Sequence, residues 1–235
     1  MTDVSYQQRR GEIEHYFDRT AVDAWKKLTS DAPVGRIRAT VRAGRDKMRA
    51  TLLSWLPSDL AGARILDAGC GTGAFAVEAA ARGAHVIAID LSSTLVDLAR
   101  DRAPKQFDNR SGKIEFFAGD MLDPAFGRFN YVVGMDSVIH YDTSDVVKVL
   151  SGLAERTSNS ILFTYAPSNP FLETMIAVGR LLPRRDRAPW ISPIATKRLH
   201  RLIADSEQLA TWRTGRTERV SSGFYTSQAL ELAHT

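Results

Sequence analysis

The chain of 235 residues has 31 Lys and Arg against 27 Asp and Glu, a formal net charge of +4, and 44% hydrophobic residues. This composition is ordinary for a soluble globular protein, and the length suits one α/β domain. No stretch is apolar enough to span a bilayer and no signal peptide opens the chain, so we expect a cytoplasmic protein. A single cysteine, Cys70, excludes a disulfide framework and disfavours a Cys-rich metal site. The pI of about 9.3 favours an anionic partner: nucleic acid, anionic lipid or an acidic small molecule.

Two helices are expected before the first strand. Apolar residues recur at helical spacing from Ile13 to Leu28, and residues 30–33 then break the run. The second helix is expected over residues 37–55, and most of its positive charges are interpreted as a solvated face. These charges are Arg36, Arg38, Arg42, Arg45, Lys47 and Arg49. Residues 1–59 are thus predicted to form a helical cap on the domain of residues 60–235.

Strands and helices alternate in this second part. Strands are predicted at 64–67, 85–90, 113–118, 129–135 and 160–165, and helices at 74–82, 92–102 and 143–156. This alternation predicts an α/β fold with a parallel sheet and helices on both faces. Residues 167–194 are irregular and rich in proline, residues 195–206 are expected to be helical, and residues 212–234 are expected to close the fold with an antiparallel hairpin.

A glycine-rich loop follows the first predicted strand. It reads Asp67-Ala68-Gly69-Cys70-Gly71-Thr72-Gly73 and precedes a helix-prone run. Glycine permits positive φ and lets a ligand approach the backbone, and the N–H groups that open the next helix attract electron-rich atoms. The loop is therefore predicted to hold a nucleotide-like cofactor. Residues 69–74 also fit the dinucleotide pattern G-x-G-x-x-G/A, so an NAD-binding oxidoreductase stays open.

Acidic residues follow the predicted strands. Asp67 can orient the glycine loop or meet an ammonium group. Asp90 stands at the interval expected for an acid that binds ribose hydroxyls. Asp120 can accept a hydrogen bond from an adenine amino group while Met121 packs on the ring, and a turn or helix-cap role is the alternative for Asp120. Asp136 follows the fourth strand.

Together with the glycine loop, these acids resemble the class I S-adenosylmethionine (SAM) methyltransferases over residues 60–165. The resemblance implies a Rossmann-like, seven-stranded, mostly parallel sheet with SAM bound across the tips of the first three strands. The residues that it implies at the cofactor are Asp67, Gly69, Gly71, Gly73, Asp90, Leu91, Asp120, Met121 and Asp136. The chain has no room for the second full domain of a dehydrogenase.

The residues after the fourth strand line the reacting centre in this fold. The [D/N]-P-P-[Y/F] motif of amino-methylating nucleic-acid enzymes is absent there, and Cys70 is misplaced for a cytosine-C5 enzyme. The high pI alone therefore does not indicate a nucleic-acid enzyme, although a basic RNA-binding module that retains the fold stays as an alternative.

Six segments spread over the chain carry a more specific resemblance: His15–Asp18, Trp25–Lys27, Val41–Arg45, Asp67–Gly73, Asp136–Tyr141 and Phe163–Pro167. Together they resemble one family, the magnesium-protoporphyrin IX O-methyltransferases of (bacterio)chlorophyll synthesis. The resemblance implies methyl transfer from SAM to a propionate of the porphyrin, with no metal bound by the protein itself. His140 is the main catalytic candidate, as a hydrogen-bonding group, a base or a ligand of the substrate Mg²⁺. Family members often carry a tyrosine shortly after the Trp25 position, where this chain has Leu28 and Thr29, so Tyr16 or Tyr141 would supply any phenol.

Residues 167–196 are expected to cover the acceptor. Apolar walls and a few cations suit a porphyrin, which is a wide apolar disc with anionic edges. The expected walls are Met175, Ile176, Leu181, Leu182, Trp190 and Ile191, and the expected cations for the second propionate are Arg180, Arg184, Arg185 and Arg187. A solvated basic loop or a contact with an anionic membrane is the alternative for these arginines. The family also makes magnesium chelatase a plausible partner, and another amphiphilic acceptor, such as a quinone precursor, stays open.

Overall fold

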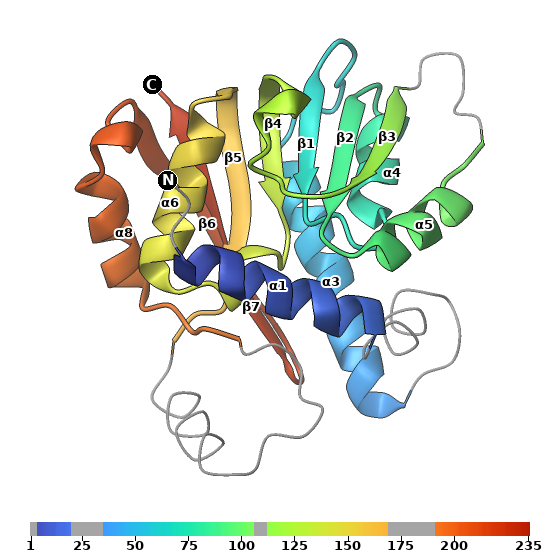
Figure 1. Ribbon diagram of the computed structural model, residues 1–235, viewed down its shortest axis with the longest axis horizontal. Coiled ribbons are helices and arrows are strands. Elements are labelled where there is room, and N and C mark those ends of the chain that lie inside the picture. Colours follow the sequence, from blue (N-terminus) through green and yellow to red (C-terminus); the bar gives the residue numbers. More distant parts are fainter. Residues whose placement is uncertain (1–3, 20–34, 106–111, 169–190) are drawn as a thin grey trace.

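The computed structural model describes residues 4–19, 35–105, 112–168 and 191–235, and they form one seven-stranded sheet between layers of helices (Figure 1). The strands are β1 (Arg64–Ala68), β2 (His85–Asp90), β3 (Lys113–Ala118), β4 (Phe129–Gly134), β5 (Thr157–Tyr165), β6 (Trp212–Ser222) and β7 (Tyr225–His234). Their order across the sheet is β3-β2-β1-β4-β5-β7-β6. The order reverses at β1, so β1 and β4 flank the switch point at which open α/β sheets bind ligands.

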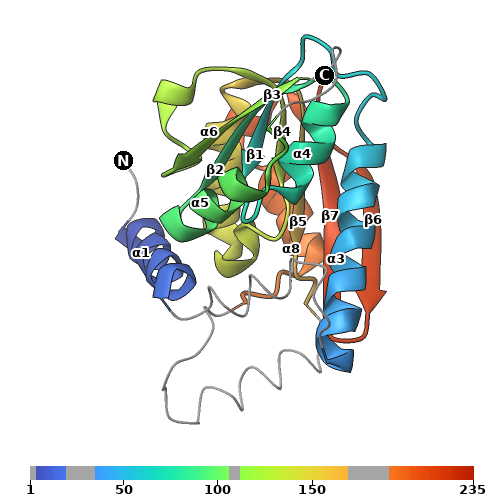
Figure 2. The same cartoon turned by 90° about the vertical axis from the view of Figure 1, so that its right-hand side faces the viewer.

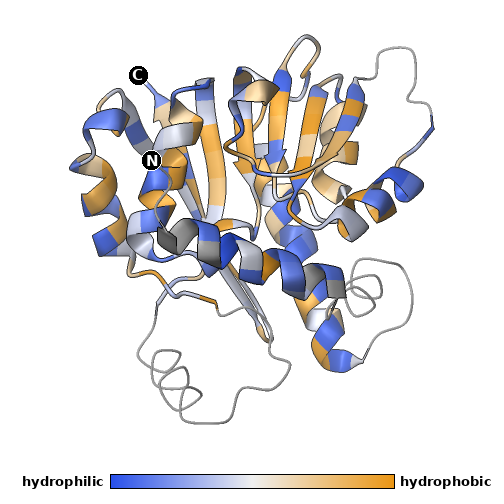
Figure 3. Cartoon of the chain, viewed as in Figure 1, coloured by the Kyte–Doolittle hydropathy of each residue, from blue (hydrophilic) through white to orange (hydrophobic). Residues whose placement is uncertain are grey.

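Strands β1 to β5 run parallel, and β7 pairs antiparallel with β5 and β6. Leu66 of β1 stands opposite Ile87 of β2 and Val132 of β4. All three side chains are buried, because helices cover both faces of the parallel strands. Figure 3 shows the resulting concentration of hydrophobic residues along the central strands.

Six α-helices are described in these ranges, and all but α1 cover the two faces of the sheet. Their bounds are α1 (Val4–Arg19), α3 (Arg36–Ser54), α4 (Ala74–Ala81), α5 (Ser93–Arg102), α6 (Thr143–Ala154) and α8 (Thr196–Ala204). Helices α3 and α4 pack into one hydrophobic cluster with β1, β6 and β7, and α6 and α8 pack into a second cluster on the opposite face. The two faces are visible in Figure 2. None of these helices is long and apolar enough to cross a membrane.

Helix α1 crosses the edge of the sheet at which the parallel strands end (Figure 1). Its Ile13 is buried in the second cluster. Arg10 forms an ion pair of 3.0 Å with Asp120, which follows β3. Asp18 accepts hydrogen bonds from the Ser92 hydroxyl and from the backbone N–H of Thr94, at the start of α5. Helix α1 is therefore attached to the carboxyl edge at two points.

The structure confirms the predicted sheet, including its closing hairpin, and differs from the prediction mainly in the first helix. Helix α1 begins at Val4, well before Ile13, and residues 20–34 lie outside the described residues. Helix α3 is more than a cap, because its Met48, Leu52 and Leu53 are buried against the sheet. Of the expected cover, only residues 167, 168 and 191–196 are described, and Pro167 forms a bridge with Ile194.

Candidate active site

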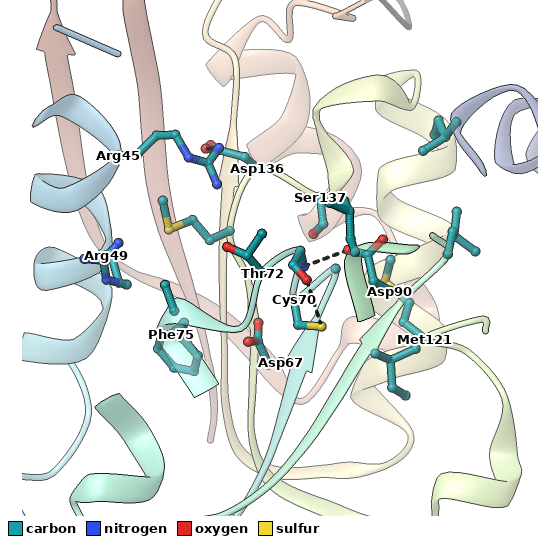
Figure 4. A pocket seen from close by; sticks show the side chains of 18 of the residues that line it. Arg45, Arg49, Asp67, Cys70, Thr72, Phe75, Asp90, Met121, Asp136 and Ser137 are labelled. Carbon is teal, nitrogen blue, oxygen red and sulfur yellow. Dashed lines mark hydrogen bonds and ion pairs between the residues drawn. The ribbon is translucent and has the colours of Figure 1, made fainter. Parts of the chain in front are cut away.

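A cavity of about 320 Å³ opens at the carboxyl edge of the sheet (Figure 4). Residues from α1, α3, the glycine loop and the ends of β2, β3 and β4 line it. The predicted site residues on its wall are Asp67, Gly69, Gly71, Asp90, Leu91, Met121, Asp136, His140 and Tyr141. The structure therefore brings together most of the predicted site residues, from the ends of β1 and β2 and from the segments that follow β1, β2, β3 and β4.

The glycine loop approaches its neighbours too closely for other residues at two positions. Gly69 has φ of 83° and Gly73 has φ of 77°, both in the left-handed region. A Cβ atom on Gly69 would lie 2.4 Å from Cβ of Ser137, and one on Gly73 would lie 2.9 Å from a ring carbon of Phe116. Glycine is thus required both by the backbone conformation and by the space available. Gly73 also precedes the first residue of α4, so the loop leads directly into a helix N-terminus.

Asp90 holds the loop in this conformation. Its Oδ2 accepts a hydrogen bond of 2.8 Å from the Gly71 N–H, and its Oδ1 accepts one of 3.0 Å from the Ser92 N–H. Burial raises the pKa of the Asp90 carboxyl, and these backbone N–H groups oppose the shift. A carboxylate has about four lone-pair positions, so Asp90 retains the capacity to accept hydrogen bonds from ribose hydroxyls as well.

Asp67 is the most unusual ionisable group of the cavity. The side chain is 2% exposed, and within the described part of the chain its Oδ2 has no hydrogen-bond partner. Burial, followed by the charge of nearby Asp90, raises the pKa of Asp67 to about 8. A buried carboxyl oxygen without a partner costs free energy. Asp67 is therefore ready to receive a cationic or hydrogen-bond-donating ligand group.

The far end of the cavity has an apolar wall. Leu91, Leu95 and Met121 contribute to it, and Met121 is 7% exposed. Asp120 is not among the lining residues, because its oxygens are engaged elsewhere: Oδ2 with Arg10, and Oδ1 with the Leu122 N–H at 2.9 Å. The turn role considered for Asp120 is thus present in the structure, and an adenine contact stays a prediction.

Asp136 follows β4 in the left-handed conformation, with φ of 54°. Its carboxylate forms an ion pair of 2.5 Å with Arg45 of α3. It also accepts hydrogen bonds from the hydroxyls of Tyr225, Ser227 and Thr164. Burial and the charge of Asp136 raise the pKa of Tyr225 above its usual range, so the phenol stays protonated. Asp136 therefore joins α3, β5 and β7 at the wall of the cavity.

His140 ends a short 3₁₀ helix, η2 (Val138–His140), and is followed by Tyr141. Both side chains are buried, at 7% and 1% exposure, and both line the cavity. The Ile139 carbonyl accepts a hydrogen bond of 2.8 Å from the Ser192 N–H. The end of the expected cover is thus attached beside His140.

Several predicted site residues do not line the cavity or cannot be placed. Tyr16 of α1 is partly buried and is not among the lining residues, although burial raises its pKa. Gly73 is not among the lining residues, although its neighbours Thr72 and Ala74 are. Arg184, Arg185, Arg187 and Trp190 lie outside the described residues.

The arginines of α3 are cavity residues that were not predicted from the sequence. Arg42, Arg45 and Arg49 all line the cavity, so the solvated-face interpretation is wrong for them. The signal was their spacing of i, i+3 and i+7, which places three residues on one helix face. Spacing alone shows that the three arginines share a helix face, but it does not show which way that face points. The buried Gly44 and Met48 of the same helix determine this orientation.

The chemistry available in the cavity is binding rather than nucleophilic attack by the protein. Cys70 lines it, but burial and the charges of Asp67 and Asp90 raise the pKa of the thiol well above its usual value. The thiolate is the nucleophilic form of cysteine, so Cys70 is unsuited to attack. No cluster of His, Cys, Asp or Glu that suits a metal ion occurs among the residues that the structure describes.

Comparisons with known proteins agree with this geometry. The family described as "Magnesium-protoporphyrin IX methyltransferase C-terminus" matches residues 134–234, and a methyltransferase-domain family matches residues 65–159. The magnesium-protoporphyrin O-methyltransferase of Rhodobacter capsulatus is 48% identical over 96% of this chain and 97% of its own length. The protein of the same description from Synechocystis is 27% identical over 95% of each chain.

The fold has a close match among solved structures. The crystal structure of magnesium protoporphyrin IX methyltransferase from Synechocystis with bound SAH superposes with a TM-score of 0.83. It covers 97% of this chain and 100% of the other, at 24% identity. This match shows the class I methyltransferase fold, and the Rhodobacter relative shows the closer kinship. The chain belongs to the magnesium-protoporphyrin O-methyltransferase family.

Proposed function

We propose that this protein transfers the methyl group of SAM to a propionate carboxylate of magnesium-protoporphyrin IX and so forms the monomethyl ester in (bacterio)chlorophyll biosynthesis. The observation that carries the proposal is the 48% identity, over nearly the full length of both chains, to a relative named for this activity. The cavity supports it, because a glycine loop, two buried acids and an apolar end suit SAM. The Synechocystis protein of the same fold has SAH bound in its crystal structure.

The reaction needs few acid or base groups from the protein. A propionate is ionised at neutral pH and is itself the nucleophile. Its oxygen forms a bond to the methyl carbon while the bond from that carbon to sulfur breaks, and SAH leaves with the electron pair. An anion and a sulfonium cation become two neutral groups, so a cavity that excludes water favours the transition state. The main task of the protein is to hold oxygen, carbon and sulfur in line.

Different cavity residues would hold different parts of SAM and of the acceptor. The glycine loop and Asp90 would hold the ribose, Met121 and Leu91 the adenine, and Asp67 the ammonium group of the methionine moiety. His140 and Tyr141 would face the acceptor, with His140 donating a hydrogen bond to the reacting propionate. Tyr16 stays a second candidate from α1.

The cover and the partners form the finer part of the proposal. Residues 167–196 would close over the porphyrin, with Trp190 as an apolar wall and Arg184, Arg185 and Arg187 near the second propionate. The net charge of +4 and the pI of about 9.3 support a peripheral contact of this otherwise cytoplasmic protein with anionic membranes. Direct delivery of the substrate by the large subunit of magnesium chelatase would shield an apolar porphyrin from water.

One incubation tests the activity. The protein is mixed with SAM and magnesium-protoporphyrin IX, and the product is analysed for a mass gain of one methylene. The same assay with a hydroxylated quinone precursor serves as the comparison acceptor. No ester under conditions in which SAH binds would contradict the proposal, and methylation of the quinone precursor alone would replace its acceptor.

Two further experiments test the predicted porphyrin contacts of the cover and the predicted contact with membranes. Neutralising Arg184, Arg185 and Arg187 together should raise the KM for the porphyrin. An unchanged KM would show that these arginines do not contact the substrate. Flotation with vesicles that contain anionic lipid, compared with zwitterionic vesicles, tests the membrane contact, and equal recovery from both would argue against it.

A further inference from the structure

Ser137 follows β4 at a position from which a serine usually caps a helix, and its hydroxyl does not do so. It is the N-cap residue of η2 and makes no side-chain cap hydrogen bond. Serine is favoured at such positions because its oxygen accepts a hydrogen bond from a backbone N–H of the first turn. Ser92 shows this usual arrangement at the start of α5, since its hydroxyl accepts from the Leu95 N–H. The ordinary structural task of a serine at this position is therefore not performed by Ser137.

The Ser137 hydroxyl is also unpaired within the described part of the chain. Its oxygen is buried and has no hydrogen-bond partner there, although the residue as a whole is only half-buried and lines the cavity. A buried hydroxyl without a partner costs free energy. This cost has an explanation when a ligand in the cavity supplies the missing partner.

Two glycines leave the space in which this hydroxyl lies. Gly134 is the last residue of β4, and a Cβ atom on it would lie 2.9 Å from Ser137 Oγ. Gly69 follows β1, and a Cβ atom on it would meet the Ser137 Cβ. Ser137 thus lies over the ends of β1 and β4, which flank the switch point of the sheet. Figure 4 shows it between Asp136, on the α3 side, and Asp90, on the opposite side.

The residue before Ser137 has a strained backbone. Asp136 has φ of 54°, in the left-handed region that is uncommon for residues other than glycine. Its N–H donates to the Thr164 hydroxyl at 2.8 Å, and this hydroxyl donates to Asp136 Oδ1 at 3.1 Å. These two hydrogen bonds with β5 stabilise the turn that directs Ser137 into the cavity. Strain of this kind is concentrated at functional sites.

The turn that carries Ser137 also delivers His140 and Tyr141 to the cavity, on the side proposed for the acceptor. The groups proposed for SAM lie on other segments, namely β1 with the glycine loop and the residues that end or follow β2 and β3. The acceptor has ionised propionates, and a hydroxyl donates a strong, charge-assisted hydrogen bond to a carboxylate. A neutral donor also suits this place, because the sulfonium of SAM would repel a Lys or Arg beside it.

We propose that the Ser137 hydroxyl donates a hydrogen bond to the propionate that receives the methyl group and so orients it toward SAM. The hydrogen bond goes to the carboxylate oxygen that does not react, and the other oxygen keeps its lone pairs for the methyl carbon. As that oxygen bonds to the methyl carbon, the bond from the carbon to sulfur breaks, and its electron pair leaves with SAH. The Ser137 proton stays on the serine throughout. The inference rests on the proposed function for its acceptor.

The test compares two porphyrins that differ only at the reacting group: magnesium-protoporphyrin IX, and its monomethyl ester, which lacks that carboxylate. Fluorescence titration in the presence of SAH, which has no methyl group to transfer, measures the Kd of each. Ser137→Ala should weaken binding of the diacid about tenfold or more, the range of a hydrogen bond to a charged group. Binding of the monoester should change less than about threefold, because it has no carboxylate for Ser137. Ser137→Cys, which nearly keeps the shape and has only a weak donor, should show the same selectivity.

Two further measurements distinguish this task from a structural one. Ser137→Ala should leave the Kd for SAH within about threefold and lower kcat about tenfold, because the carboxylate loses its orientation. In the ligand-free protein its Tm should stay unchanged or rise, because an unpaired buried hydroxyl is removed. Ser92→Ala should instead lower the Tm by about 2–4 °C, since that hydroxyl caps α5.

Ser144→Ala is the matched control, because Ser144 is exposed on α6 and is absent from the cavity wall. It should behave as the unmodified protein does in every measurement. Equal loss of the diacid and the monoester in Ser137→Ala, or no loss of either, would overturn the proposed contact. A loss of SAH affinity would also overturn it and assign the hydroxyl to the cofactor. An unmodified protein that forms no ester would contradict the proposed function, whereas the binding comparison needs no turnover and tests Ser137 separately.

Discussion

Asp67 carries a buried carboxyl group whose ionisation opposes folding when the cavity holds no ligand. An aspartate in an unfolded chain ionises near pH 3.9, whereas burial raises the pKa of Asp67 to about 8. Between these values the folded chain binds one more proton than the unfolded chain. The stability that protonated Asp67 contributes is therefore complete below about pH 4 and is lost as the pH rises through about 8.

Asp67→Asn should remove this part of the pH dependence. In the ligand-free protein, the free energy of unfolding should fall less steeply between about pH 5 and pH 8, by up to about 1.4 kcal/mol per pH unit. Urea unfolding at a series of pH values measures the slope. Asp101→Asn is the control, because Asp101 is exposed on α5, and its slope should match the unmodified protein. An unchanged slope in Asp67→Asn would show that Asp67 is ionised in the folded state.

His140 should affect turnover more than cofactor binding. His140→Ala removes a buried side chain that lines the cavity. The kcat should fall about tenfold to a hundredfold. This loss is small for an acid–base residue, because a propionate needs little deprotonation. SAH affinity should stay within about threefold. Steady-state kinetics and calorimetry on the same preparation give both values. His234→Ala, at an exposed position, is the control. Equal losses in kcat and in SAH affinity would indicate a structural role for His140.

Helix α3 depends on the absence of a side chain at Gly44. Gly44→Ala places a methyl group 2.5 Å from the Tyr225 ring, so helix and hairpin must separate. Overpacking of this kind costs about 1–3 kcal/mol, and the separation should also weaken SAH by displacing Arg45. Denaturant unfolding and calorimetry measure the two effects. Gly11→Ala is the matched control, because nothing lies within 4 Å of the added Cβ on α1, and alanine favours helices. A Gly44→Ala variant as stable as the unmodified protein would show that α3 tolerates the displacement.

Helix α1 should loosen as a unit when its two attachments are removed. Asp18→Ala removes the acceptor for Ser92 and Thr94 at the start of α5, and Arg10→Gln removes the ion pair with Asp120. The double variant should show faster amide hydrogen exchange in α1 while exchange in α6 stays unchanged. SAH should also dissociate faster, because Ile13 of α1 lines the cavity. Glu14→Gln, an exposed change on the same helix, is the control. Unchanged exchange in the double variant would mean that burial of Ile13 suffices to hold α1.

The strands and helices could be predicted because each depends on a local pattern. The predicted bounds of β2 and β3 agree with the structure at both ends, since a short apolar run is followed by an acid or glycine in each case. Ser92, at the start of the helix predicted over 92–102, caps α5, and its hydroxyl accepts from the Leu95 N–H. No exact start was predicted for the first helix, because the residues before Ile13 are mostly polar and show no apolar period, and the structure places this start at Val4.

The cofactor side of the cavity was predictable for a related reason, and the α3 side was not. Parallel strands deliver Asp67, Asp90 and Met121 to one edge, so fold class alone brings them together. Arg45 and Asp136 are 91 positions apart, and their contact depends on how closely α3 packs against β7. Helical periodicity identifies the buried face of α3 but gives neither its partner nor its distance, and a basic face resembles a solvated one until both are known.

The whole molecule should be stabilised by SAH, because residues from two helices and from the ends of several strands line the cavity together. Its wall includes α1, α3, the glycine loop and the residues after β2, β3 and β4, so a ligand that fills it opposes the separation of both helices from the sheet. A ligand at about a hundred times its Kd stabilises the folded state by about 2.7 kcal/mol. For a domain of this size, that corresponds to a rise in Tm of roughly 5–11 °C.

Scanning calorimetry with SAH, with NAD and without ligand measures this rise. SAH should raise Tm and NAD should leave it unchanged, because the two nucleotides share adenosine and differ in what they place at the α3 end of the cavity. A rise in Tm with NAD and none with SAH would indicate that the glycine loop binds a dinucleotide, and it would contradict the proposed methyl transfer.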